Sequence, residues 1–270
     1  MCRGVSPDTR GIYPFNLRFS RVVSLARFPF MMDGVAVGPI SCVISSSSMG
    51  TMKYSPAGNS PNRHRLYASL GLDQERVYAC TQVHARDVLV IDRGSPHTGP
   101  QADGMISRDN GVWLSVTVAD CLPVYLYDTE SGGFGILHSG WQGTGIVMTA
   151  LRLMEEHWHT RPEAVAAVLG PCIRSCCYQV DAERAHAFEA EFGGFGGVYP
   201  LGPVVHPPRY IDLQAANARL LANAGVRNIA VCGDCTFTDA RLGSFRREGP
   251  SYTLMAALVG HFCEESAWLI

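Results

Sequence analysis

The stretch VWLSVTVADCLPVYLYD, residues 112–128, decides the fold class of this chain. Val112–Ala119 is rich in Val, Leu and Trp, as buried strands are, and Val124–Tyr127 resumes that pattern. Asp120–Pro123 separates the two runs, and this break is expected to expose the Cys121 thiol at a sheet edge. Phe134–Leu137 predicts the next strand, so the middle of the chain builds a β-sheet.

Helical patterns follow this sheet region. Apolar residues at helical spacing predict a helix that begins near Thr144, which is expected to cap it, and ends before Arg161. Asp181 and Asp212 have the side chains of helix caps, and each precedes a further helical pattern. More strands are predicted at Ala164–Leu169, Asn228–Val231 and Leu254–Val259. This alternation indicates an α/β or α+β fold in which helices cover the faces of sheets.

Composition limits the function classes. The chain has 270 residues, 47% of them hydrophobic, which is enough for one large core, and we expect a main domain at 46–270 after an N-terminal extension at 1–45. A net charge of −2 provides no basic surface for nucleic acid. The sequence has no apolar run of about 18 residues and no recognisable secretion signal, so we expect a cytoplasmic protein without membrane contact.

Three residues at predicted strand ends form a candidate metal site. His84 follows Thr81-Gln82-Val83, Cys121 lies in the break described above, and His138 precedes Ser139-Gly140-Trp141. Two imidazoles and one thiolate are the donors of a catalytic zinc site with its fourth position open. Each residue taken singly is also compatible with a structural role, as a hydrogen-bonded histidine or a packed cysteine. Asp120 could orient a ligand from the second shell.

The chain has ten cysteines, and a second metal site is an alternative. Cys232 and Cys235 form a CxxC pair that could join Cys172, Cys176 and Cys177 in a structural zinc site. A redox role requires a helix after the first cysteine of the pair, and the following residues do not predict one. The default for these cysteines is packing or pocket lining, with mostly free thiols in a reducing compartment.

Eight segments taken in order resemble one family. The sequence resembles the laccase-domain family of purine nucleoside phosphorylases, formerly described as multicopper polyphenol oxidases, from about Met49 onward. The segments are Thr81–His84, Ala102–Gly104, Val118–Val124, Leu137–Trp141, Leu169–Ile173 with Cys176–Tyr178, Asp212–Asn217, Gly233–Thr236 and Ser244–Gly249.

The resemblance implies a zinc ion held by His84, Cys121 and His138. It also implies a single layered α/β/β/α domain like that of bacterial toxin deamidases. The implied reactions are phosphorolysis of adenosine, inosine, guanosine and methylthioadenosine, and hydrolytic deamination of adenosine. In such an enzyme Asp120 is our candidate for moving the proton, and Gln82 and Arg246 are candidates for binding the substrate. The expected assembly is a monomer or homodimer, with purine nucleosides and phosphate as its small-molecule partners.

The chain departs from the family pattern at three places. Ala85 stands where the family usually has glycine, Gln142 where it usually has arginine, and Gly50–Lys53 where it has an Asn-Leu motif. Three other functions stay open on these grounds. They are a copper-dependent polyphenol oxidase, an amide hydrolase with Cys121 as nucleophile and His138 as base, and a binding protein that has lost catalysis.

Overall fold

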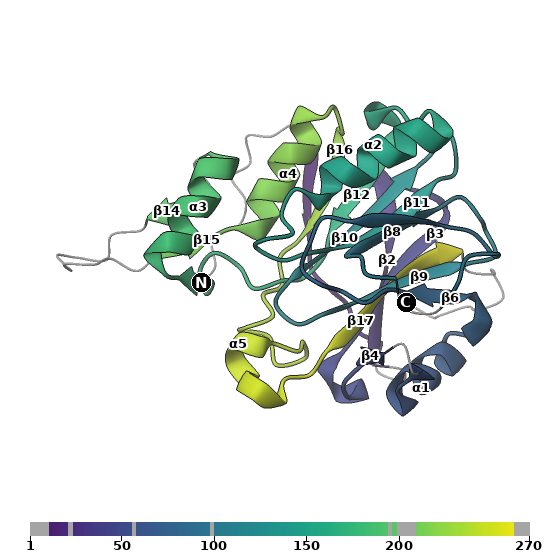
Figure 1. The fold of residues 1–270 in the computed structure, drawn as a ribbon, viewed down its shortest axis with the longest axis horizontal. Coiled ribbons are helices and arrows are strands. Elements are labelled where there is room, and N and C mark those ends of the chain that lie inside the picture. Colours follow the sequence, from purple (N-terminus) through teal and green to yellow (C-terminus); the bar gives the residue numbers. More distant parts are fainter. Residues whose placement is uncertain are drawn as a thin grey trace.

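Two β-sheets stack on one another in the centre of the computed structural model, which describes residues 11–20, 24–55, 58–97, 100–193, 196–198 and 209–261 (Figure 1). The larger sheet is mixed, with parallel pairs at β1–β16, β16–β12 and β8–β7 and antiparallel pairs elsewhere. Its strands, in spatial order, are β1 (Ile12–Phe15), β16 (Asn228–Cys232), β12 (Val165–Leu169), β10 (Leu122–Asp128), β11 (Phe134–Ser139), β8 (Gly104–Ser107) and β7 (Val88–Ile91).

The second sheet is mostly antiparallel, with a parallel pair at β9–β6. Its order is β2 (Leu25–Met32), β3 (Val35–Ser45), β17 (Met255–His261), β9 (Trp113–Val118) and β6 (Val77–Ala79). Two small sheets lie outside this pair of layers. One contains β13 (Gln179–Val180), β15 (Arg209–Ile211) and β14 (Gly196–Val198), and the other contains β4 (Tyr54–Ser55) and β5 (Gly58–Asn59).

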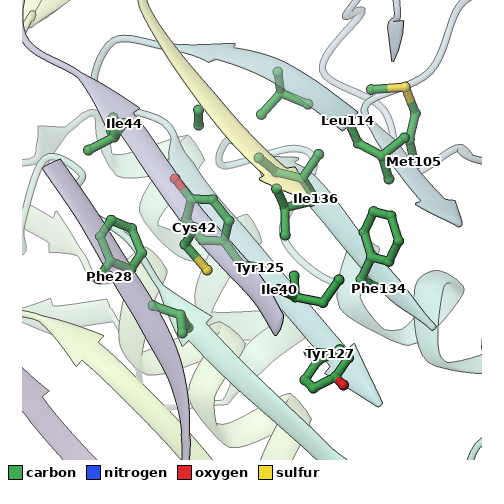
Figure 2. Close-up of a cluster of buried hydrophobic side chains, with 14 of the residues drawn as sticks. Phe28, Ile40, Cys42, Ile44, Met105, Leu114, Tyr125, Tyr127, Phe134 and Ile136 are labelled. Atoms are coloured by element: carbon green, nitrogen blue, oxygen red, sulfur yellow. The ribbon is translucent and has the colours of Figure 1, made fainter. Parts of the chain in front are cut away.

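Aromatic and aliphatic side chains fill the space between the two large sheets (Figure 2). Phe28 of β2 meets the Tyr125 ring of β10 edge to face at 5.3 Å between centroids. Two residues further along each strand, the rings of Phe30 and Tyr127 are tilted by 39° to one another, with their centroids 5.5 Å apart. Both faces of this core are apolar because alternate residues of each strand point inward.

Helices cover the outer face of each sheet, which completes the α/β/β/α order (Figure 1). The helices α2 (Ile146–Trp158), α3 (Ala182–Phe192) and α4 (Leu213–Asn223) share a core with the larger sheet. Helix α1 (Pro61–Ser69) packs Leu66 and Tyr67 against the other sheet. None of the helices in the described part of the chain combines the length and the apolar character that crossing a bilayer requires.

Most predicted elements occur where the sequence placed them, with two corrections. Asp181 and Asp212 accept the capping hydrogen bonds of α3 and α4, as predicted. Thr144 does not cap α2, because the cap position is Gly145 and the Thr144 hydroxyl instead donates to the Gly140 carbonyl at 2.9 Å. The runs before and after Asp120–Cys121 belong to different sheets, so this break is a crossing between layers.

The residues before position 46 contribute strands to both layers. Strand β1 pairs with β16 in the larger sheet, and β2 and β3 form one side of the other.

Removing the Phe134 ring should destabilise the inter-sheet core. Phe134 has no exposed surface, so Phe134→Ala is expected to lower the free energy of unfolding by about 3–5 kcal/mol. Urea denaturation followed by fluorescence measures this change. Val35→Ala is the matched control, because Val35 is 66% exposed and its truncation should change stability by less than about 0.5 kcal/mol.

Candidate metal centre

The candidate metal centre lies at one end of four neighbouring strands, β10, β11, β8 and β7. Pro123 of β10 pairs with His138 of β11, and Leu137 pairs with Gly104 of β8. Gly104 also pairs with Val88 at the start of β7. Strands β10, β8 and β7 run in one direction and β11 runs against them, so the starts of β10, β8 and β7 coincide with the end of β11.

The three predicted ligands converge at this end of the sheet. The ligand atoms of His84, Cys121 and His138 all lie within 4.8 Å of one another, and the two imidazole rings are 4.9 Å apart at 82°. Tetrahedral zinc, with bonds of about 2.0–2.3 Å, needs nitrogen and sulfur donors roughly 3.4–3.6 Å apart. His138 is buried, Cys121 is half-buried and His84 is exposed. The donor set therefore fits a zinc ion that is open to solvent on the His84 side.

Asp103 was missed as a site residue in the sequence, where it is only part of the Ala102–Gly104 segment. Its fully buried carboxylate accepts a hydrogen bond from His138 Nδ1 at 2.8 Å. The same carboxylate accepts the backbone N–H groups of Val83, His84 and Ala85 at 2.8–3.1 Å. With Nδ1 engaged, His138 presents Nε2 to the site, which is the arrangement that carboxylates impose on metal-binding histidines.

The electrostatics of the site favour a thiolate at Cys121. Burial alone would raise the pKa of this thiol, but the neighbouring imidazoles of His138 and His84 lower it to about 6. Burial would likewise lower the pKa of His138, whereas Cys121 and Asp103 raise it to about 9. Burial opposes ionisation of Asp103, and hydrogen bonds from His138 and from backbone N–H groups still lower its pKa. The Cys121 thiolate and the Asp103 carboxylate thus both stabilise a positive charge on His138, which lies next to them.

Two of the site residues adopt left-handed backbone conformations, which side chains other than glycine rarely do. His84 has φ +63° and Asp120 has φ +86°. Ala85 is not among the described residues with positive φ, so its methyl group needs no glycine-like backbone. Gly140 lies tightly against the site, since a Cβ there would lie 3.1 Å from Cys121 Sγ and 3.4 Å from a carbon of the His84 ring, and these side chains would have to shift by a few tenths of an ångström.

Asp120 anchors the segment that carries Cys121. One carboxylate oxygen accepts from the Thr236 hydroxyl at 2.6 Å and the other from the Arg246 backbone N–H at 2.7 Å. Its carbonyl accepts from the Ile173 N–H at 2.9 Å. The carboxylate is buried and already bonded on both oxygens, so these contacts describe a positioning function, and its part in proton transfer stays a prediction.

The side chains of Gln82 and Arg246 bond to different elements. The Gln82 side chain makes three hydrogen bonds to Thr117 of β9, which attach the His84 segment to the second sheet. Arg246 belongs to the short helix α5 (Phe245–Glu248), and its guanidinium is exposed and donates to the Gln179 carbonyl at 2.9 Å. Of the two, Arg246 keeps donor groups available for a ligand.

The cysteines do not form the alternative four-cysteine site. Cys232 lies in the core between the sheets and Cys172 in the core under the helices, on opposite faces of the larger sheet. Cys176, Cys177 and Cys235 approach one another, but Cys176 is disulfide-bonded and offers no thiolate. The other described cysteines are free thiols, as predicted, and Cys42 and Cys80 pack in the core.

A small hollow lies beside the metal centre. It is lined by Arg86, Trp141, Gln142 and the α3 residues Phe188, Glu191 and Phe192, among others. Arg86 pairs with Glu191 at 2.5 Å and donates to the Gln142 carbonyl at 3.2 Å. The guanidinium of Arg86, two residues after His84, therefore contacts the Gly140–Gly143 turn.

The sequence matches a known family over most of its length. The family described as multi-copper polyphenol oxidoreductase laccase matches residues 45–261. The chain belongs to this family. The match begins at the last residue of β3 and includes His84, Cys121 and His138.

Relatives and solved structures agree with this membership. The purine nucleoside phosphorylase YlmD of Geobacillus stearothermophilus is 31% identical over 74% of this chain and 77% of its own length. A purine nucleoside phosphorylase of Deinococcus radiodurans is 31% identical over 86% of this chain and 87% of its own. The crystal structure of Geobacillus YlmD has a TM-score of 0.73 and covers 84% of this chain and 93% of that chain, at 27% identity.

Asp103→Asn should weaken zinc binding without unfolding the protein. The amide keeps the shape of the carboxylate, but it loses the charge and cannot accept all four hydrogen bonds. We expect zinc affinity to fall by about 10–100-fold in competition with a chromophoric chelator. Asp109→Asn is the matched control, since that carboxylate also accepts backbone N–H groups but lies in the loop between β8 and β9. Equal affinity of folded Asp103→Asn and native protein would contradict this assignment.

Proposed function

We propose that this chain is a zinc-dependent purine nucleoside phosphorylase that also deaminates adenosine. The observation that carries the proposal is the convergence of His84, Cys121 and His138 at one sheet end, with His84 exposed. The names of the Geobacillus and Deinococcus relatives support the reaction class. The proposed substrates are adenosine, inosine, guanosine and methylthioadenosine with phosphate, for a cytoplasmic monomer or homodimer.

The donor chemistry supports zinc in preference to copper. When bound, zinc supplies a Lewis acid with a coordination position open to water or substrate. A multicopper oxidase needs several copper centres, which are rich in histidine. In the part of the chain that the structure describes, the other group of close donors contains Cys176, Cys177 and Cys235 and no histidine.

The residues around the centre have distinct proposed functions in the reaction. Asp103 holds His138 and the His84 backbone in place, so the donor atoms need little rearrangement when substrate binds. Phosphorolysis breaks the bond between C1′ of the ribose and N9 of the base and joins C1′ to a phosphate oxygen. Arg246 is the proposed anion contact, Gln82 a contact to the nucleoside and Asp120 the proton carrier for deamination.

Product identification tests this function. Purified protein is incubated with adenosine and inorganic phosphate, and the products are separated by chromatography. Adenine with ribose 1-phosphate reports phosphorolysis, and inosine with ammonia reports deamination. We expect both pairs of products and about one zinc per chain by elemental analysis. The absence of adenine and inosine would favour a binding protein, and copper with turnover of phenols would favour the oxidase.

Loss of one ligand should abolish turnover. His84→Ala removes an exposed ligand, so we expect folded protein whose zinc content and kcat/KM for adenosine both fall by more than about 100-fold. His157→Ala is the control, because His157 is an exposed histidine on α2. A zinc-depleted His84→Ala protein that turns over adenosine at the native rate would contradict the proposal.

An amide hydrolase is the second candidate, because Asp103, His138 and Cys121 are arranged as an orienting acid, a base and a nucleophile. The likeness to toxin deamidases implied by the sequence belongs to this candidate and stays a prediction. Iodoacetamide labelling followed by mass spectrometry separates the two candidates. We expect zinc to protect Cys121 in metal-loaded protein, and rapid labelling of Cys121 there would favour the hydrolase.

A further inference from the structure

Two arginines lie near Tyr178, and Arg246 is the first. Its backbone N–H donates to Asp120, the residue before Cys121, at 2.7 Å. Its guanidinium carbon lies 5.6 Å from the centroid of the Tyr178 ring. The backbone hydrogen bond fixes the position of the Arg246 main chain, and the face of the Tyr178 ring attracts its guanidinium cation.

The second arginine is Arg184, which approaches from helix α3. Its guanidinium carbon lies 4.8 Å from the centroid of the Trp141 ring. Trp141 directly follows Gly140, where an added Cβ would lie 3.1 Å from Cys121 Sγ. The guanidinium groups of Arg184 and Arg246 both lie close enough to the Tyr178 hydroxyl to oppose the rise in its pKa that burial causes. Tyr178 is therefore a common neighbour of the two arginines, and Cys121 is also close enough to influence its hydroxyl electrostatically.

Arg184 has donor groups that the protein leaves unused. Its Nε is buried without a hydrogen-bond partner. Its charged contact is Asp181, whose Oδ2 lies at the long distance of 3.9 Å from Nη2, and that aspartate is mostly exposed. A buried, unpartnered guanidinium N–H costs free energy, and an oxyanion ligand would remove that cost.

We propose that Arg184, Tyr178 and Arg246 form an anion subsite that binds inorganic phosphate beside the metal centre. Phosphate is a tetrahedral anion that is largely doubly charged near neutral pH, and two guanidinium groups near one hydroxyl provide several N–H donors and one O–H donor for its oxygens. This inference rests on the proposed function for its choice of phosphate and adds two residues, Arg184 and Tyr178.

Calorimetric titration of the zinc-loaded protein with inorganic phosphate tests the subsite directly. Arg184→Gln is expected to weaken phosphate binding at least about 10-fold, because a charge-assisted pair of hydrogen bonds is lost. Arg184→Lys keeps the charge but not the planar fork, and should fall between native protein and Arg184→Gln. Tyr178→Phe removes one hydroxyl and should weaken binding less. Arg161→Gln is the control, since Arg161 is an exposed arginine paired with Glu130 outside the site.

Steady-state kinetics provide a second measurement. Arg184→Gln should raise KM for phosphate by about 10–100-fold, with KM for the nucleoside and zinc content unchanged. Unchanged phosphate binding and unchanged KM in folded Arg184→Gln would overturn the subsite, even if the native enzyme is a phosphorylase. Phosphate binding that depends on Arg184 in a protein without nucleoside turnover would support the subsite and refute the proposed function.

Discussion

One buried carboxylate, that of Asp103, determines how the metal centre is assembled. Burying an ionised carboxylate costs several kcal/mol unless hydrogen bonds replace its water. Here three consecutive backbone N–H groups and the His138 imidazole replace that water. The same bonds hold the left-handed turn at His84 and the orientation of His138. The two histidines are thereby coupled, because neither can move without leaving Asp103 unsatisfied.

The stacking of the two sheets restricts the third ligand. Cys121 lies in a crossing of three residues, Ala119 to Cys121, between β9 of one sheet and β10 of the other. Stacked sheets are about 10 Å apart, and such a linker reaches at most about 14 Å. Asp120 further fixes the crossing through bonds to Thr236 and Arg246. The thiol position thus follows from the apolar core between the sheets, even though that core contains no ligand.

Local patterns in the sequence predict the elements but not their neighbours. The caps at Asp181 and Asp212 and the strands on either side of Asp120 follow from residues close in sequence. Strands β9 and β10 enter different sheets because they pair with different partners. Strand β9 pairs with β17, which is far away in the sequence, and β10 pairs with β11, the next strand in the chain. Asp103 escapes sequence reasoning for the same reason, since its partners lie 18–20 and 35 residues away. The ligands were identified from their residue types and from the family resemblance.

Two of the three departures from the family pattern, Ala85 and Gln142, lie beside the candidate metal centre without supplying a donor atom. Ala85 is accommodated because the left-handed residue of its turn is His84. The sterically demanding positions are Gly140 and Gly143, where a Cβ would approach Cys121 Sγ at 3.1 Å and the Ala85 carbonyl oxygen at 2.9 Å. The Gln142 side chain is exposed, so a change there alters the charge of the adjoining hollow and leaves the donor atoms in place. These two departures therefore bear on the surroundings of the three candidate donors and not on the donor atoms themselves.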